Sequence, residues 1–230
     1  MAEILLIETA TKVCSVGLLS EQALFIRESY EQRSHAELIT IFINEVIQKS
    51  GTAMNKIDAV AVSMGPGSYT GLRIGVSTAK GICYAMDKPL IAIDTLQAMA
   101  SGMMEQTEDK QRLYAPMIDA RRMEVYTAIF DAENEKLCKT EALIVDENAF
   151  QPWLSDQKVV FFGDGSAKCK PLLAQHSNAH FVDDFHPSVR FMAKLAQEKF
   201  KAGVFENTAY FEPYYLKDFI AAPPRVKGLR

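Results

Sequence analysis

A glycine-rich segment at residues 63–81, SMGPGSYTGLRIGVSTAKG, is the part of the sequence whose composition first points to chemistry. Its five glycines surround a predicted turn and the helix that follows, and such turns often bind phosphate. A Walker A loop requires G-x-x-x-x-G-K-S/T, whereas Gly71 is followed by Leu72 and Arg73. A Rossmann fingerprint requires G-x-G-x-x-G after the first strand, whereas this chain has G-x-G-x-x-x-G after the fourth. The spacing therefore disfavours both kinds of nucleotide-binding loop.

The helix predicted over residues 70–86 suggests another role for these glycines. Gly71, Gly75 and Ala79 recur every four residues and form one row of small residues. Each glycine costs about 1 kcal/mol relative to alanine inside a helix, so a helix that also contains Gly81 needs a reason for them. Small residues allow a second backbone to approach closely. That backbone belongs either to the protein's own sheet or to another protein.

The preceding helix, predicted over residues 34–49, favours the second alternative. Ser34 and Glu37 match a capping box at its start. Two stripes then run along the helix, one with Leu38, Ile41, Phe42 and Glu45 and the other with Ile39, Ile43, Val46 and Ile47. Because one apolar stripe is enough to pack a surface helix on a sheet, the second stripe predicts a covering partner.

We therefore predict a protein–protein interface on these two helices. The residues expected to bind the partner are Leu38, Ile41, Phe42, Glu45, Gly71, Arg73, Gly75, Val76 and Ala79. Leu38→Glu or Gly75→Trp is expected to abolish association in analytical ultracentrifugation and to leave the circular dichroism spectrum intact.

The order of predicted elements repeats once along the chain. The first half reads β-β-β-α-β-α-β-α, with strands expected at 3–10, 13–20, 23–30, 58–64 and 89–93. In the second half, Ile118-Asp119 matches Ile7-Glu8, and VVFFGDGS at 159–166 echoes AVSMGPGS at 61–68. A duplicated βββαβαβ unit is the plan of the actin, heat-shock chaperone and sugar kinase superfamily, so we expect a two-lobed, actin-like α/β fold.

The lobe boundaries follow from this repeat. The polar run EQTEDKQR at 105–112 is the natural linker. We expect an N-terminal actin-like lobe over 1–104 that carries the dimerisation helices, a C-terminal actin-like lobe over 113–212 and a tail over 213–230. The tail is locally basic, with Lys217, Arg225, Lys227 and Arg230 against Asp218. A flexible end, a return to the first lobe and a contact with RNA or a partner are the alternatives for it.

Composition places the chain among folded globular proteins. Hydrophobic residues make up 48% and charged residues 23%, without a low-complexity segment. A protein that binds nucleic acid alone usually has a basic face, but the formal charge is −4, so a role with RNA is expected to need a partner. Four scattered cysteines fit a reduced cytosol. Early acidic residues and the lack of an apolar run near about 18 residues predict a cytoplasmic protein without a signal peptide or membrane span.

A histidine pair in the second half of the chain is a candidate metal site. His176 and His180 have the i, i+4 spacing that binds zinc on a helix. They fall instead in a predicted polar turn before a strand, without a following glutamate. We expect a surface turn and no metal site, although Asp183 and His186 lie close by in the sequence.

Several segments closely resemble the bacterial TsaB (YeaZ) family, namely GPGSYTGLRIGVSTAKG, RSHAEL, PLIAIDTLQAMA and IDARRMEVY. Members of this family are subunits of the machinery that makes threonylcarbamoyladenosine beside the anticodon of tRNAs reading codons that start with A. The match is dense over residues 3–101, clear over 117–126 and thin afterwards except for PYYLKD. The resemblance implies an actin-like fold and a heterodimer with a metal-bearing catalytic paralogue.

The resemblance also implies that this chain is not the catalyst. The paralogue's H-x-x-x-H metal pair corresponds here to Thr95 and Met99, and neither is a useful ligand for a hard catalytic metal. We expect a scaffold without metal or cofactor that is homodimeric alone and exchanges into the heterodimer, together with an ATPase subunit. It would meet tRNA only through that complex and would not bind membranes.

The superfamily's phosphate-binding turns are altered in this sequence. The family's first turn usually reads Asp-Thr-Ser, whereas this chain has Glu8-Thr9-Ala10, and the second reads Asp119-Ala120-Arg121-Arg122 without glycine or hydroxyl. Two arginines can meet an anion but do not form a backbone phosphate cradle. Residues that would face a nucleotide or anion are Glu8, Thr9, Gly65, Gly67, Asp119 and Arg121. ATP turnover is not expected; the alternative function is a small-molecule kinase or metallopeptidase-like hydrolase of the same superfamily.

Overall fold

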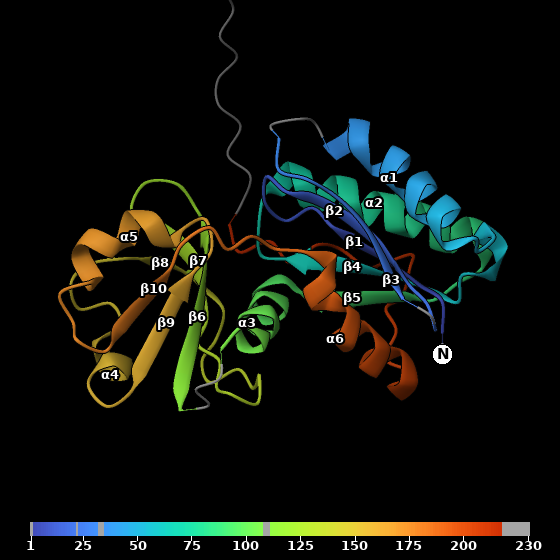
Figure 1. Ribbon diagram of the computed structural model, residues 1–230. Coiled ribbons are helices and arrows are strands. Elements are labelled where there is room, and N and C mark those ends of the chain that lie inside the picture. The colour runs from blue at the N-terminus through green and yellow to red at the C-terminus, as the bar shows by residue number, and fades with distance from the viewer. Residues whose placement is uncertain (1, 22, 32–34, 108–110, 218–230) are drawn as a thin grey trace, which may run out of the picture.

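The computed structural model describes residues 2–21, 23–31, 35–107 and 111–217, which form two lobes side by side (Figure 1). Each lobe is built on a five-stranded sheet, with strand orders β3-β2-β1-β4-β5 and β10-β9-β6-β7-β8. The two orders are equivalent under the predicted repeat. The two-lobed, actin-like α/β fold and its duplication are therefore confirmed.

The first sheet forms from short apolar segments with tight connections. Its strands are β1 (Ile4–Glu8), β2 (Cys14–Leu19), β3 (Leu24–Ser29), β4 (Ala59–Gly65) and β5 (Leu90–Asp94). The pairs β1–β2 and β2–β3 are antiparallel, whereas β4 is parallel to both β1 and β5. The β2–β3 turn is closed by the Ser20 N–H, which donates to the Ala23 carbonyl at 3.0 Å.

Two long helices, α1 (His35–Ser50) and α2 (Tyr69–Met86), cover one face of this sheet (Figure 1). The Ser68 hydroxyl caps α2 by accepting from the Gly71 N–H at 3.3 Å. The Ser34 cap predicted for α1 lies outside the described residues. A 3-10 turn, η1 (Met54–Lys56), precedes β4. Over the part of the chain that the structure describes, no helix has the length and apolarity needed to cross a membrane.

The second lobe repeats the pattern with shorter elements. They are β6 (Arg112–Asp119), β7 (Glu124–Thr127), β8 (Glu141–Ile144), α4 (Gln151–Leu154), β9 (Lys158–Phe162), α5 (Ser166–Leu173) and β10 (Ala179–Val182). As in the first sheet, three strands form an antiparallel meander and two further strands add in parallel. The four-residue α4 stands where the first lobe has the sixteen-residue α1, so this lobe has less helical cover.

One helix differs from the predicted lobe boundary. Helix α6 (Val189–Ala202) falls within the range assigned to the second lobe, but it packs on the first sheet, on the face opposite α1 and α2 (Figure 1). Its apolar face joins the core residues Ile4, Leu6, Ala61, Ile91, Val189, Met192 and Ala196. The reason is the open apolar face of the first sheet, which α6 buries. Helix α3 (Thr95–Glu105) lies between the lobes and contacts both α6 and β6.

After α6 the chain runs along the first lobe. The Glu206 N–H donates to the Leu90 carbonyl at 2.8 Å, and the Tyr214 N–H donates to the Met64 carbonyl at 2.7 Å. Lys80 on α2 donates to the Phe211 carbonyl at 2.8 Å. Residues 204–217 therefore brace the edge strand β5, the turn before α2 and α2 itself.

Candidate functional site

The predicted partner-binding residues on α1 are mostly buried inside the chain. Leu38 and Phe42 are only 7% and 5% exposed and belong to the core of the first lobe. Helix α1 contacts β2, β3 and α2 together, so the two predicted stripes, apart from Ile41, lie mainly on one broad buried face. The inference that the second stripe needs a partner is wrong, and Leu38→Glu would disrupt the fold instead of testing association.

The glycine row of α2 also has an internal explanation. A Cβ at Gly71 or Gly75 would lie closer than 3.0 Å to the carbonyl or the hydroxyl of Thr9, in the β1–β2 turn. The Thr9 hydroxyl donates to the Gly71 carbonyl at 2.9 Å, which ties the turn to the helix. The backbone that these glycines admit is therefore the chain's own, and the prediction that they make room for another protein is wrong. Val76 and Ala79 are likewise buried in the core.

Other residues of the two helices do face solvent. Ile41 is 51% exposed on α1, and Tyr84 is 88% exposed on the outward side of α2. Arg73 is exposed beside them on α2, with its guanidinium over the Tyr69 ring at 5.5 Å. Glu45, by contrast, forms an ion pair with Arg27 of β3 within the lobe, and Arg27 in turn lies over the Phe42 ring.

Gly81 differs from the other helical glycines. Its position is exposed, and no heavy atom among the described residues lies within 4 Å of where a Cβ would stand. The cost of this glycine in α2 therefore has no compensating contact inside the described chain. We define the outer helix face as Ile41, Arg73, Gly81 and Tyr84. Sequence reasoning missed Tyr84, although its spacing places it opposite the row of Gly71 and Ala79.

The β1–β2 turn is closed on itself. Glu8 is 1% exposed, and its Oε1 accepts from the Ala10 N–H at 2.6 Å. The Thr9 N–H donates to the Ser63 hydroxyl at 3.3 Å. Two amides that would contact a phosphate in this turn are thus already used by the chain's own side chains. Within the described residues, Glu8 Oε2 has no hydrogen-bond partner.

Burial is the main cause of the shifted pKa values in and next to this turn. It raises the pKa of Glu8 from 4.5 to about 7, although hydrogen bonds from the Ala10 N–H and from Ser63 oppose the shift. Burial and the neighbouring Glu8 charge also raise the pKa of the Cys14 thiol to about 11. Glu8 is therefore largely protonated below neutral pH, unlike the ionised carboxylate that would bind a metal nucleotide.

The β6–β7 turn of the second lobe is exposed, and it is closed by local hydrogen bonds. Asp119 accepts from the Arg121 N–H at 2.9 Å and forms an ion pair with Lys168 of α5. Partial burial raises the pKa of Asp119, but the Lys168 and Arg121 hydrogen bonds outweigh it and bring that pKa below its ordinary value. Asp164 accepts from the Asp119 N–H at 2.9 Å, and its own pKa is raised by burial and by the Asp119 charge.

The six residues predicted to face a nucleotide or anion divide into two groups. Glu8, Thr9, Gly65 and Gly67 pack against the chain itself. A Cβ at Gly65 would meet the Tyr214 carbonyl at 2.8 Å, and one at Gly67 would meet Ala10. Asp119 and Arg121 lie at the surface of the second lobe. The structure therefore does not bring the six together around one open site.

The two residues predicted to stand at the paralogue's metal positions, Thr95 and Met99, are both buried. The Thr95 hydroxyl accepts from the Gly65 N–H at 3.2 Å, and Met99 lies in the core between the lobes. In the described ranges, no three His, Cys, Asp or Glu side chains are grouped so that they could hold a metal. Of the predicted histidine pair, His176 lies in the turn after α5 and contacts the Glu147 carbonyl, whereas His180 lies in β10.

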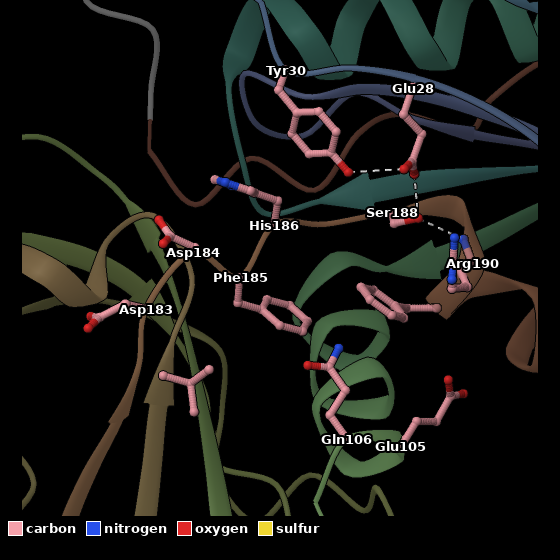
Figure 2. A pocket seen from close by; sticks show the side chains of 12 residues that line it. Glu28, Tyr30, Glu105, Gln106, Asp183, Asp184, Phe185, His186, Ser188 and Arg190 are labelled. Carbon is pink, nitrogen blue, oxygen red and sulfur yellow. Dashed lines mark hydrogen bonds between the residues drawn. The ribbon is translucent and has the colours of Figure 1, made fainter.

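A pocket of about 400 Å³ opens between the lobes where the chain crosses from β10 to α6 (Figure 2). Glu28 organises it by accepting from the hydroxyls of Tyr30, Ser15 and Ser188. The ring of His186 lies beside the Tyr30 ring in a tilted arrangement, with the ring centroids 5.4 Å apart. Sequence reasoning missed this pocket because Glu28 and Ser188 lie far apart in the chain and match no motif. The Glu28 carboxylate is used to join β3 to the start of α6.

Comparisons with known proteins relate the chain to the tRNA threonylcarbamoyladenosine machinery. Residues 28–224 match the family model of TsaD, tRNA N6-adenosine threonylcarbamoyltransferase. The TsaB proteins of Escherichia coli and Haemophilus influenzae are 31% and 30% identical to the chain, over 95% and 94% of it and 96% and 93% of their own lengths.

Solved structures give the same assignment. YeaZ from Pseudomonas aeruginosa superimposes with a TM-score of 0.81 at 25% identity, covering 94% of this chain and all of that protein. A polyphosphate/ATP-glucomannokinase from Arthrobacter shares the fold alone, with a TM-score of 0.50 at 10% identity. The chain therefore belongs to the TsaB (YeaZ) family of tRNA threonylcarbamoyladenosine biosynthesis proteins.

Proposed function

We propose that this protein is a non-catalytic dimerisation subunit of the complex that transfers a threonylcarbamoyl group to the adenosine next to the anticodon of tRNAs reading A-starting codons. The observation that carries the proposal is the closed β1–β2 turn, in which Glu8 and Ser63 occupy the amides that a phosphate would need. Thr95 and Met99, buried at the positions of the paralogue's metal pair, support it as well. The family membership supplies the reaction.

The partner surface in this proposal is the outer helix face. Tyrosine and arginine are enriched at interface hot spots, and Tyr84 and Arg73 are both exposed on α2. Gly81 between them leaves room for a closely approaching helix. Ile41 adds an exposed apolar side chain on α1. The partner is the catalytic paralogue within the complex, together with an ATPase subunit, and a second copy of this chain when it is alone.

Charge substitutions on the outer helix face test this surface. Ile41→Lys and Tyr84→Lys are each expected to weaken binding to the catalytic paralogue roughly 30-fold or more, the size of a hot-spot loss. The new lysine at position 41 would have Glu37 and Glu45 four residues away, which supports the helix. Isothermal titration calorimetry measures the heterodimer, and analytical ultracentrifugation measures the homodimer.

Ile144→Lys is the matched control. Ile144 is 72% exposed on β8, opposite Glu124 on β7, so a lysine there also gains a carboxylate neighbour. It lies in the other lobe and is expected to leave association unchanged. Equal losses for all three variants, or no loss for Tyr84→Lys, would exclude the outer helix face as the partner surface.

The alternative is an enzyme of the same superfamily, and one observation favours it, because the matching family model is that of a transferase. Purified chain without its partner is expected to hydrolyse no radiolabelled ATP. ATP turnover by the wild-type chain that disappears in Glu8→Ala would favour the enzyme.

A further inference from the structure

The β6–β7 turn presents two consecutive arginines to solvent. Arg121 and Arg122 are exposed, with φ angles of 70° and 47°. Non-glycine residues seldom adopt this left-handed conformation, and they persist there only when the surroundings impose it. The Ala120 N–H donates to the Glu124 carbonyl, and the Glu124 N–H donates to the Arg121 carbonyl, each at 3.1 Å. The turn therefore holds both arginines in a defined position.

The carboxylates of the turn do not neutralise these arginines. Asp119 is paired with Lys168 from α5, and Glu124 is paired with Lys217 from the C-terminal segment. Neither arginine forms an ion pair within residues 2–21, 23–31, 35–107 and 111–217. Both side chains are thus free to meet an anion.

A further cation comes from the first lobe. Lys12 is exposed in the β1–β2 turn, and its positive charge acts to lower the pKa of both Asp119 and Asp164 in the second lobe. The groups gathered here are Lys12, Arg121, Arg122, Lys168 and Lys217, with Asp119, Glu124 and Asp164. Five cations against three carboxylates leave a local charge of +2 on a chain whose formal charge is −4.

The C-terminal end of the described chain lies beside the arginine turn. Lys217 is the last described residue, and its ion pair with Glu124 fixes it beside the arginine turn. Residues 218–230 contain Arg225, Lys227 and Arg230 against one acid, Asp218. We call the five cations of this region the basic patch, namely Lys12, Arg121, Arg122, Lys168 and Lys217.

We propose that the basic patch contacts the phosphate backbone of the tRNA substrate when the chain is assembled in its complex. This inference rests on the proposed function. Arginine suits phosphate because its guanidinium donates two parallel hydrogen bonds, and most contacts that position a protein on nucleic acid go to the backbone. A patch with few free cations on an acidic chain supplies only part of an RNA site, so its contribution appears in the complex and not in the chain alone.

The test compares charge variants in the complex reconstituted with the catalytic paralogue. Arg121→Gln/Arg122→Gln removes both charges and keeps side chains of similar backbone preference. Arg121→Lys/Arg122→Lys keeps the charges. The matched control, Lys139→Gln/Lys201→Gln, removes two exposed cations from a loop of the second lobe and the end of α6. Fluorescence anisotropy measures the binding of an unmodified, full-length tRNA transcript between about 50 and 300 mM KCl.

The double glutamine variant is expected to weaken tRNA binding roughly tenfold at about 0.1 M salt. The slope of log K against log salt is expected to become shallower by the amount that corresponds to the loss of about one to two phosphate contacts. The double lysine variant keeps the wild-type slope because the slope counts charges. The Lys139/Lys201 control keeps both slope and affinity. Unchanged tRNA affinity in Arg121→Gln/Arg122→Gln would overturn the proposal.

Two readouts separate this proposal from the proposed function. Heterodimer formation is measured on the same samples; a wild-type chain that does not bind the paralogue contradicts the proposed function, whereas intact heterodimer with unaltered tRNA binding contradicts the patch alone. Loss of a protein subunit from the double glutamine variant, with tRNA affinity retained, would assign the patch to an acidic protein partner and would likewise overturn the RNA contact.

Discussion

The two equivalent turns of the duplicated lobes differ in what covers them. In the first lobe, the turn after β1 lies beneath α2, and its carboxyl group, Glu8, is 1% exposed. In the second lobe, the turn after β6 is open, and the Asp119 side chain is 48% exposed. The first turn supports a helix, and the second presents arginines to solvent.

The helices that follow explain the difference. The segments AVSMGPGS and VVFFGDGS align Gly71 with Cys169 and Pro66 with Asp164. Because Gly71 has no side chain, Thr9 can approach it closely, and the first turn packs against α2 and is hydrogen-bonded to it. The buried Cys169 side chain occupies the equivalent place in α5, and Asp164 instead holds the second turn through the Asp119 N–H. Glycine at position 71 thus lets α2 pack on the first turn, whereas the aligned position of α5 carries the Cys169 side chain.

The largest expected effect comes from disrupting the contact between the first turn and α2. In Gly71→Ala the new methyl group would collide with the Thr9 carbonyl, so the free energy of unfolding is expected to fall by roughly 3 kcal/mol or more. Urea denaturation followed by circular dichroism measures it. Gly81→Ala is the control in the same helix, and it is expected to raise the free energy of unfolding by up to about 1 kcal/mol.

The two glycine variants also distinguish a glycine needed for packing inside the chain from one needed for contact with a partner. Gly81→Ala is expected to weaken association with the paralogue while stabilising the monomer, because its methyl group points outward. Gly71→Ala as stable as the wild type would show that the turn does not depend on the helix.

The second effect concerns pH and sharpens the same contrast. The pKa of Glu8 is raised from 4.5 to about 7, so the folded chain keeps a proton that the unfolded chain releases. The resulting stability is fully present below about pH 4.5 and is lost as the pH rises through about 7, a contribution of about 3 kcal/mol. Glu8→Gln is expected to remove this dependence. Parallel unfolding free energies of both proteins between about pH 4.5 and 8 would contradict it.

The smallest effect belongs to the exposed turn. Asp119→Asn loses the ion pair with Lys168 but keeps an acceptor for the Arg121 N–H, and exposed ion pairs contribute little. The free energy of unfolding is expected to fall by no more than about 1 kcal/mol in the same urea experiment. A decrease in the free energy of unfolding as large as that of Gly71→Ala would mean that both turns contribute equally to stability.

Much of the fold was predictable because it depends on local patterns. Strand periodicity, the repeated Gly-x-Gly-Ser segments and the matching Ile-Glu and Ile-Asp pairs indicate two related lobes before any contact is known. The family resemblance rests on the segment from Gly65 to Gly81 and is confirmed by relatives over most of the chain.

What could not be predicted depends on contacts between distant segments. The spacing of Gly71 and Gly75 reveals a close approach but not whose backbone approaches, and the structure assigns it to Thr9. The amphipathic pattern of α6 does not say which sheet it covers. The hydrogen bond between Glu28 and Ser188 joins residues without any shared motif.

In the proposed function, this chain acts through a partner and not as a catalyst. The most direct measurement is the incorporation of labelled threonine into an unmodified tRNA by the reconstituted machinery. Product is expected only when this chain and the catalytic paralogue are both present, with a severe loss for Tyr84→Lys although that variant remains folded. Product formed by this chain without the paralogue, or full activity of the paralogue without this chain, would contradict it.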